Sequence, residues 1–258
     1  NRIRKALSKL KLLVVQDIFR TETAKLAHVI LASSSFAEKD GTFTNTERRV
    51  QRVRCTVVPV GDSRPDWWIT TELGKRLGGK GFSYTSPDQI FEEIRTVTPS
   101  YAGMTYSRLE NGGLQWPCPT IDHSGTPILH IERFSRGKGA FKVLEYRPPA
   151  EQPDKDYPFI LTTGRSPYHF HTGTMTRRVA GLTELQATEI LEISAIDAAQ
   201  LGIAEGDTVR VTSRRGSVTA NAQVSKRLVP GVIFMTFHFP ETATNILTNP
   251  AIDPVAKI

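Results

Sequence analysis

Residues 12–31, LLVVQDIFRTETAKLAHVIL, contain two apolar runs joined by a short polar segment. The runs at 12–15 and 28–31 have the length and composition of buried parallel strands. The segment 21–27 can form a short helix, because a threonine stands where a helix cap is needed. A strand, a helix and a second strand with tight connections are typical of an open, doubly wound α/β sheet. In such sheets, ligands bind beyond the carboxyl ends of the strands.

The sequence around this unit predicts helices with irregular connections. The basic residues 1–11 can form a helix before the first strand. Another helix is expected from Ser86, because proline is favourable at the first helical position. Residues 147–158 have the composition of a linker. A further helix is predicted from Asp66, with an apolar side made by Trp67, Trp68, Ile69, Leu73 and Leu77.

The last hundred residues predict many short strands and one short helix. Ser194 and Asp197 have the spacing of a capping box, and Gly202 can end the helix that they begin. Strands are predicted at 159–161, 190–193 and 231–237, with a hairpin around Arg214 and Arg215. This pattern favours a small closed barrel. We therefore predict a partial α/β domain over 1–150 and a β-barrel domain over 151–258.

Composition limits the kinds of partner. The 258 residues are 39% hydrophobic and 23% charged, and no apolar run is long enough to span a membrane. The net charge of +7 favours an anionic partner. The charge is spread along the chain rather than interleaved with aromatics, so we do not expect nucleic acid. Cys55 and Cys118 form no disulfide or metal-binding pattern and are expected to be structural thiols.

Polar residues gather in two places in the first half. Gln16 and Asp17 follow the first strand, where an amide and a carboxylate suit a ribose or a nucleobase. Asp17 could equally cap the next helix. The second place is AEKDGTFTNTERRVQRVR, residues 37–54, which contains Lys39 and four arginines. This stretch could bind an anion or could be a solvated face.

Two further clusters follow predicted strands of the second half. Residues 163–172, TGRSPYHFHT, combine a turn, a hydroxyl and a guanidinium that can hold an anion. His169 and His171 could ligate a metal, but hydrogen bonding or packing is the better interpretation without a third ligand. Residues 237–245, FHFPETATN, offer an aromatic and an amide. Because no nucleophile–base pair, Walker loop or GxGxxG stands out, we expect ligand binding without catalytic residues or metal ligands in this chain.

Longer motifs resemble a known family. They are the run 14–54, PDWWI at 65–69, GLQWPCP at 113–119, TGRSPYHFHTGTMTRRV at 163–179 and FHFPE at 237–241. In residues and in order, these motifs resemble those of the catalytic subunits of molybdopterin-dependent formate dehydrogenases, of the dimethyl-sulfoxide-reductase superfamily. The likeness extends over essentially the whole chain. His28, Ala32 and Ser33 depart from the family's usual residues after and within the second strand.

The resemblance implies a C-terminal portion of such a subunit, with a double-psi β-barrel after the α/β region. The implied cofactor is bis(molybdopterin guanine dinucleotide) with molybdenum or tungsten, used for the two-electron oxidation of formate to CO2 or the reverse. The catalytic Cys or selenocysteine and the [4Fe-4S] cluster would lie in an N-terminal part. The cofactor-binding residues implied by the resemblance are Gln16, Asp17, Lys39, Asp66, Thr163, Gly164, Arg165, Ser166, Tyr168, His169, His171, Thr172, Phe237 and Asn245.

The implied partners are the N-terminal part of the same subunit, electron-transfer iron–sulfur or flavin subunits, and formate or CO2. A cytoplasmic location is expected, and a periplasmic one stays open. The isolated chain is predicted to be inactive toward formate. Two alternatives remain: the same cofactor clamp in another oxidoreductase such as a nitrate reductase, and a non-catalytic double-psi-barrel binding module.

Overall fold

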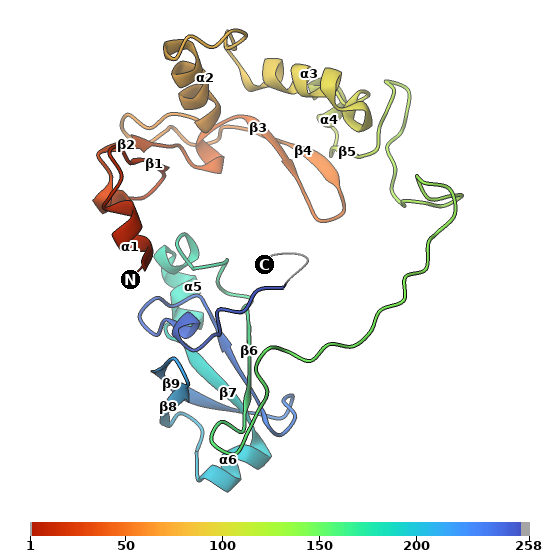
Figure 1. The fold of residues 1–258 in the computed structure, drawn as a ribbon. Helices are drawn as coiled ribbons and strands as arrows, with labels where there is room; N and C mark the ends of the chain where they lie inside the picture. The colour runs from red at the N-terminus through yellow and green to blue at the C-terminus, as the bar shows by residue number, and fades with distance from the viewer. Residues whose placement is uncertain (1, 254–258) are drawn as a thin grey trace. The chain divides into compact units, whose positions relative to one another are not determined.

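The structure, a computed structural model, describes residues 2–253, which form two compact units that divide after Phe141 (Figure 1). The first unit begins with helix α1, Arg2–Leu7, which is shorter than the predicted 1–11. Ile3 and Leu10 are exposed, so little tertiary packing extends this helix, and short helices are marginal without packing. Residue 1 lies outside the described residues.

The predicted pair of parallel strands is present. β1, Val14–Asp17, pairs in parallel with β2, Val29–Ala32, and Val14 lies opposite Val29. The connection contains a 3-10 turn, η1 (Ala24–Leu26), where we predicted a short helix. The prediction that these strands are buried is wrong: Val14 and Ile30 are each 44% exposed. A two-stranded sheet has too few neighbours to cover both of its faces.

The rest of the first unit is built around an antiparallel sheet and three helices. The strands are β3 (Gly41–Thr44), β4 (Arg49–Val53) and β5 (Leu114–Gln115), in the order β3-β4-β5. The helices are α2 (Asp66–Arg76), α3 (Pro87–Val97) and α4 (Tyr106–Leu109), with 3-10 turns η2 (Phe36–Glu38) and η3 (Pro99–Tyr101). The core contains Val50, Phe91, Met104, Leu109 and Cys118.

Both long helices begin where the sequence predicts. Ser86 precedes α3 with Pro87 at its first turn. The predicted apolar side of α2 is wrong in part, because Ile69 is buried while Leu77 is 85% exposed. Trp68 and Leu73 are also exposed. Helical spacing fixes which side chains share a face, but burial requires a partner surface.

The second unit holds one mixed, curled five-stranded sheet in the order β6-β10-β7-β9-β8 (Figure 1). Its strands are β6 (Ile160–Gly164), β7 (Ile190–Ser194), β8 (Thr208–Ser213), β9 (Gly216–Ser225) and β10 (Val232–Thr236). β6 and β8 are the two edges of this sheet within the described residues. A cavity of about 450 Å³ is lined by residues of β6, β7, β8 and β10 and of the segment 149–159. Between the strands lie η4 (Thr176–Arg178), α5 (Ala180–Leu185) and α6 (Ala195–Leu201), and η5 (Thr244–Ile246) follows β10.

Local signals in this unit were predicted correctly. β8 and β9 form the hairpin around Arg214 and Arg215. Ser194 Oγ caps α6 by accepting a hydrogen bond from Asp197 N–H at 3.1 Å. The Asp197 carboxylate accepts from Gly231 N–H at 2.9 Å, so the cap also fixes the start of β10. Gly202 ends α6 with φ +66°, a left-handed conformation that favours glycine.

None of the helices within residues 2–253 is long and apolar enough to cross a membrane.

Candidate functional site

The ends of three parallel segments meet in the first unit. β1 ends at Asp17 and runs parallel to β2. Ser33, directly after β2, forms a parallel bridge with Arg64, and α2 begins shortly afterwards at Asp66. The carboxyl ends of these segments therefore lie along one edge, which is where α/β sheets bind ligands.

Asp66 joins two of the other predicted site residues. Gln16 Nε2 donates to Asp66 Oδ1 at 2.7 Å, and Lys39 Nζ forms an ion pair with Asp66 Oδ2. Lys39 Nζ also donates to the Ser34 carbonyl oxygen at 3.2 Å, so the ammonium retains one N–H for a further acceptor. Burial raises the pKa of Asp66, but its hydrogen bonds, chiefly those from Lys39 and Gln16, and the charge of Lys39 lower it, and its pKa lies below the ordinary value.

Asp17 lies beside this cluster but makes a local contact. Its Oδ1 accepts a hydrogen bond from Phe19 N–H at 3.0 Å, which closes a short turn after β1. The hydrogen bonds among the described residues thus join Gln16, Lys39 and Asp66, while Asp17 organises the backbone next to them.

The surroundings of the Lys39–Asp66 pair leave room and polar groups for a ligand. A groove of about 250 Å³ lies beside the pair and is lined also by Trp67 and Tyr106. Among the described residues, the buried hydroxyls of Ser34 and Ser63 have no hydrogen-bond partner. Buried hydroxyls normally have one, so this edge fits a polar ligand that would supply it.

The arginines that follow Lys39 are held by protein groups. Arg48, with φ +67°, donates to the carbonyl oxygens of Trp116, Thr126 and Pro127, the last two at 3.0 and 2.9 Å. Its guanidinium also lies 5.6 Å from the centre of the Trp116 ring. Arg48 therefore fastens the turn before β4 to the segment after β5.

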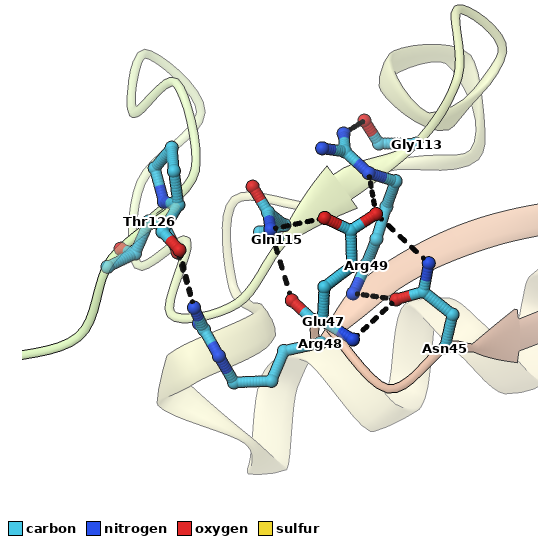
Figure 2. Close-up of polar contacts among 8 residues, drawn as sticks. Asn45, Glu47, Arg48, Arg49, Gly113, Gln115 and Thr126 are labelled. Atoms are coloured by element: carbon cyan, nitrogen blue, oxygen red, sulfur yellow. Dashed lines mark hydrogen bonds and ion pairs between the residues drawn. The ribbon is translucent and has the colours of Figure 1, made fainter.

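A network of hydrogen bonds also joins the turn before β4 to β5 (Figure 2). Asn45 Oδ1 accepts from the backbone N–H groups of Glu47 and Arg49, at 3.1 and 2.9 Å. Gln115 Nε2 donates to the Glu47 carbonyl oxygen at 3.1 Å and to its carboxylate at 3.2 Å. Arg52 and Arg54 pair with Glu110. The basic stretch is thus largely a structural junction, and Lys39 is the cation that lies at the sheet edge.

The second unit brings its two predicted clusters together through one strand pair. β6 and β10 are parallel neighbours, with Thr163 opposite Met235 and Gly164 opposite Thr236. The segments that follow, 165–172 and 237–245, therefore both begin at the carboxyl end of this strand pair. The guanidinium of Arg165 lies 5.8 Å from the centre of the Phe237 ring, which is a direct contact between the two segments.

The histidines of the first segment have different environments. His169 is buried and contacts the Gln186 carbonyl oxygen through Nε2 at 2.8 Å and Thr176 Oγ1 through Nδ1 at 3.2 Å. It therefore holds the base of the loop. His171 is exposed, with φ +49°. Among the described residues, no group of three or more His, Cys, Asp and Glu side chains could hold a metal ion.

Several of the other predicted residues of this unit are accessible. Arg165 and Tyr168 are exposed. The hydroxyl of Thr172 lies 3.0 Å from that of Thr174, and Asn245 is exposed within η5. The hydroxyls of Ser166 and Thr244 are buried and, among the described residues, without a hydrogen-bond partner. Exposed cationic and amide groups next in the chain to unpaired buried hydroxyls fit an anionic, hydrogen-bonding ligand.

His238 contacts both ends of the loop and was not predicted as a site residue. It is fully buried, accepts from Ser166 N–H through Nε2 at 2.9 Å, and donates through Nδ1 to the His171 carbonyl oxygen. Its position two residues after an apolar strand is the only sequence signal of this role. Such a signal does not distinguish His238 from a core histidine.

Comparison with known proteins agrees with this geometry. Residues 1–76 match the family model described as molybdopterin oxidoreductase, and residues 159–258 match the molydopterin dinucleotide binding domain. Over 99% of its length, the chain is 53% identical to the F420-dependent formate dehydrogenase subunit alpha of Methanocaldococcus jannaschii. Over 100% of its length, it is 51% identical to the F420-dependent formate dehydrogenase 2 subunit alpha of Methanococcus maripaludis. The chain spans 38% of the length of each of these relatives.

A solved structure supports the fold. Acetylene hydratase from Pelobacter acetylenicus matches with a TM-score of 0.65 and 17% identity, over 96% of this chain and 37% of that protein. At this identity the likeness concerns the fold alone. The two domain matches and the similarity over the full chain confirm the family that the motifs resembled. The chain is homologous over its full length to the C-terminal, molybdopterin dinucleotide-binding region of formate dehydrogenase alpha subunits.

Proposed function

We propose that this chain is the cofactor-clamping part of a formate dehydrogenase that holds bis(molybdopterin guanine dinucleotide). The observation that carries the proposal is the 53% identity, over nearly the whole chain, with a formate dehydrogenase alpha subunit. The site geometry supports it, because each unit gathers polar groups beyond the carboxyl ends of parallel strands. We further propose that the sheet of the second unit belongs to a closed double-psi β-barrel, and that β1 and β2 belong to a doubly wound sheet, both completed by the rest of the polypeptide.

In this proposal the chain binds and orients the nucleotide ends of the cofactor. When bound, the cofactor would supply the two-electron redox chemistry, with molybdenum or tungsten as its metal. Lys39 offers its remaining N–H and its charge to a phosphate, while Gln16 and Asp66 offer an amide and a carboxylate to a ribose or base. The second unit provides a second region of contact with the cofactor. Its residues are Thr163, Gly164, Arg165, Ser166, Tyr168, His169, His171, Thr172, Phe237 and Asn245.

The proposal leaves the reacting groups outside this chain. The catalytic Cys or selenocysteine, the [4Fe-4S] cluster and the electron-transfer subunits, whether iron–sulfur or flavin, belong to the remainder of the enzyme. Cys55 and Cys118 are both free thiols, which is compatible with the reducing cytoplasm that we propose as the location. The boundary between the two domains at residue 150 stays a prediction.

The alternative to a formate dehydrogenase is a nitrate reductase, which one of the sequence comparisons supports. The chain is 40% identical over its whole length to a nitrate reductase of Symbiobacterium thermophilum. The cofactor clamp would be the same, so the binding residues do not distinguish the two reactions.

The full-length enzyme tests the proposal. Acid hydrolysis of the purified protein should release two GMP per subunit, as a bis dinucleotide requires, and formate should reduce an artificial acceptor. Release of GMP with nitrate reduction but without formate oxidation would favour the alternative. A protein that releases no GMP would contradict both.

A further inference from the structure

We infer that His238 is a positioning residue that holds the loop 165–172 in the conformation needed to receive the cofactor. The inference rests on the proposed function, and it adds a residue that neither the motifs nor the loop itself had assigned. His238 follows β10, while the loop follows β6, and these strands are parallel neighbours.

The imidazole contacts the loop at two separate points. Ser166 N–H donates to Nε2 at 2.9 Å, near the start of the loop. The carbonyl oxygen of His171, near its end, can only accept, so Nδ1 carries the proton and donates to it. One neutral tautomer therefore satisfies both contacts, and it fixes the start and the end of the loop relative to each other.

The surroundings of the ring leave it little freedom. His238 has no exposed surface, and its ring lies 5.8 Å from that of His169 and 6.4 Å from that of Phe239. Thr236, just before it, is fixed by Glu189, whose carboxylate accepts from the Thr236 N–H at 2.8 Å and from its hydroxyl at 2.7 Å. The histidine is thus held by the sheet and in turn holds the loop.

The loop itself needs this support. His171 has φ +49° and Gly173 has φ +70°, so the chain reverses sharply in a left-handed conformation. A Cβ at position 173 would lie 2.5 Å from Arg177 Cδ and 3.2 Å from the His238 carbonyl oxygen. The tight turn therefore packs directly on the backbone of His238. Ser166, whose N–H is bound by Nε2, also carries one of the unpaired buried hydroxyls.

Two conservative variants separate the two contacts. In H238Q the amide oxygen can take the place of Nε2 and accept from Ser166 N–H, whereas in H238N the amide nitrogen can take the place of Nδ1 and donate to His171. H238A removes both contacts. S194A is the matched control, because it weakens the cap of α6 in the same unit without touching the loop.

The experiment uses the full-length protein in cofactor-free and cofactor-loaded forms. Hydrogen–deuterium exchange of the peptide covering 165–172 reports on the loop, and GMP released on hydrolysis reports on cofactor content. We expect Ser166 N–H exchange about tenfold faster in H238N and H238A than in the wild type, as for loss of one buried hydrogen bond. H238Q should remain within about twofold, and S194A should match the wild type. Cofactor content should fall in H238A and be restored in H238Q.

The outcomes separate the two claims. If the wild-type protein releases GMP and all four variants retain it with unchanged loop exchange, the inference is wrong and the proposed function stands. Equal losses in H238A and S194A would also overturn the inference, because general destabilisation would then explain the result. If the wild-type protein releases no GMP, the proposed function is wrong and the inference falls with it.

Discussion

Lys39 and Asp66, which lie 27 positions apart in the chain, form an ion pair at the edge where β1, β2 and α2 meet. The pair orients the ammonium through the carboxylate and the Ser34 carbonyl oxygen. This arrangement makes Lys39 a fixed charge rather than a mobile surface lysine, since its side chain is only 22% exposed.

Replacing Lys39 by alanine should weaken cofactor retention in the full-length protein. A lost charged hydrogen bond of about 1.5–3 kcal/mol corresponds to a dissociation constant at least about tenfold higher. GMP content after extensive buffer exchange measures the effect. Lys25→Ala is the control, because Lys25 pairs with Glu22 on an exposed surface. Unchanged GMP in Lys39→Ala would mean that the lysine has a structural role alone.

The ion pair also predicts a dependence of stability on pH. The folded pKa of Asp66 is lowered, so folding favours the ionised form. Its stabilising contribution is complete above the pKa of an unfolded aspartate, about 3.9, and is lost as the pH falls through the lower pKa of the folded state. The melting temperature of Asp66→Asn should therefore lie below that of the wild type at neutral pH, and the difference should shrink below about pH 4. Asp62→Asn, on an exposed loop, controls for the removal of a charge. A difference that stays constant down to about pH 3 would contradict this account.

Arg48 should be more important for stability than its neighbour Arg49. A lysine cannot reproduce the fork with which Arg48 reaches three carbonyl groups. We expect Arg48→Lys to lower the free energy of unfolding by about 1.5–3 kcal/mol, and Arg49→Lys by less than about 1 kcal/mol. Urea unfolding followed by tryptophan fluorescence measures both, because Trp116 lies beside Arg48. Equal losses would show that the fork adds no stability.

The two thiols should differ in reactivity. Cys118 has no exposed surface and belongs to the core of the first unit, whereas Cys55 is exposed. Cys55 lies on the surface beyond β4, and our expectation that it is a structural thiol stays a prediction. Of these two thiols, a maleimide reagent should label Cys55 alone in the native protein and both after denaturation. Rapid native labelling of a Cys55→Ser variant would show that the core around Cys118 opens readily.

Features fixed by neighbouring residues were predictable from the sequence. The start of α3 at Pro87, the cap at Ser194 and the hairpin at Arg214 each depend on a few adjacent positions. Burial was less predictable, because it depends on what covers a surface. The apolar composition of β1 and β2 predicted that they are buried. Within residues 2–253 these strands pair only with each other, and their side chains stay partly exposed.

The candidate site divides in the same way. Motif resemblance indicated Gln16, Lys39 and Asp66, and the structure joins them by hydrogen bonds. The role of His238 depends on contacts with Ser166 and His171, which lie 72 and 67 positions away. No local pattern encodes such a contact, since it arises only when β6 and β10 become neighbours.

The pairing of β6 with β10 has a consequence for biosynthesis. Within the described residues, β6 is the first strand of its sheet to be synthesised, and its only partner there is the last. Among the described strands, β6 therefore has no partner until the ribosome has passed Thr236, and an unpaired edge can form wrong pairings. The two loops that His238 connects come together only at that stage, so a partly translated chain still lacks the contact region that the second unit would provide.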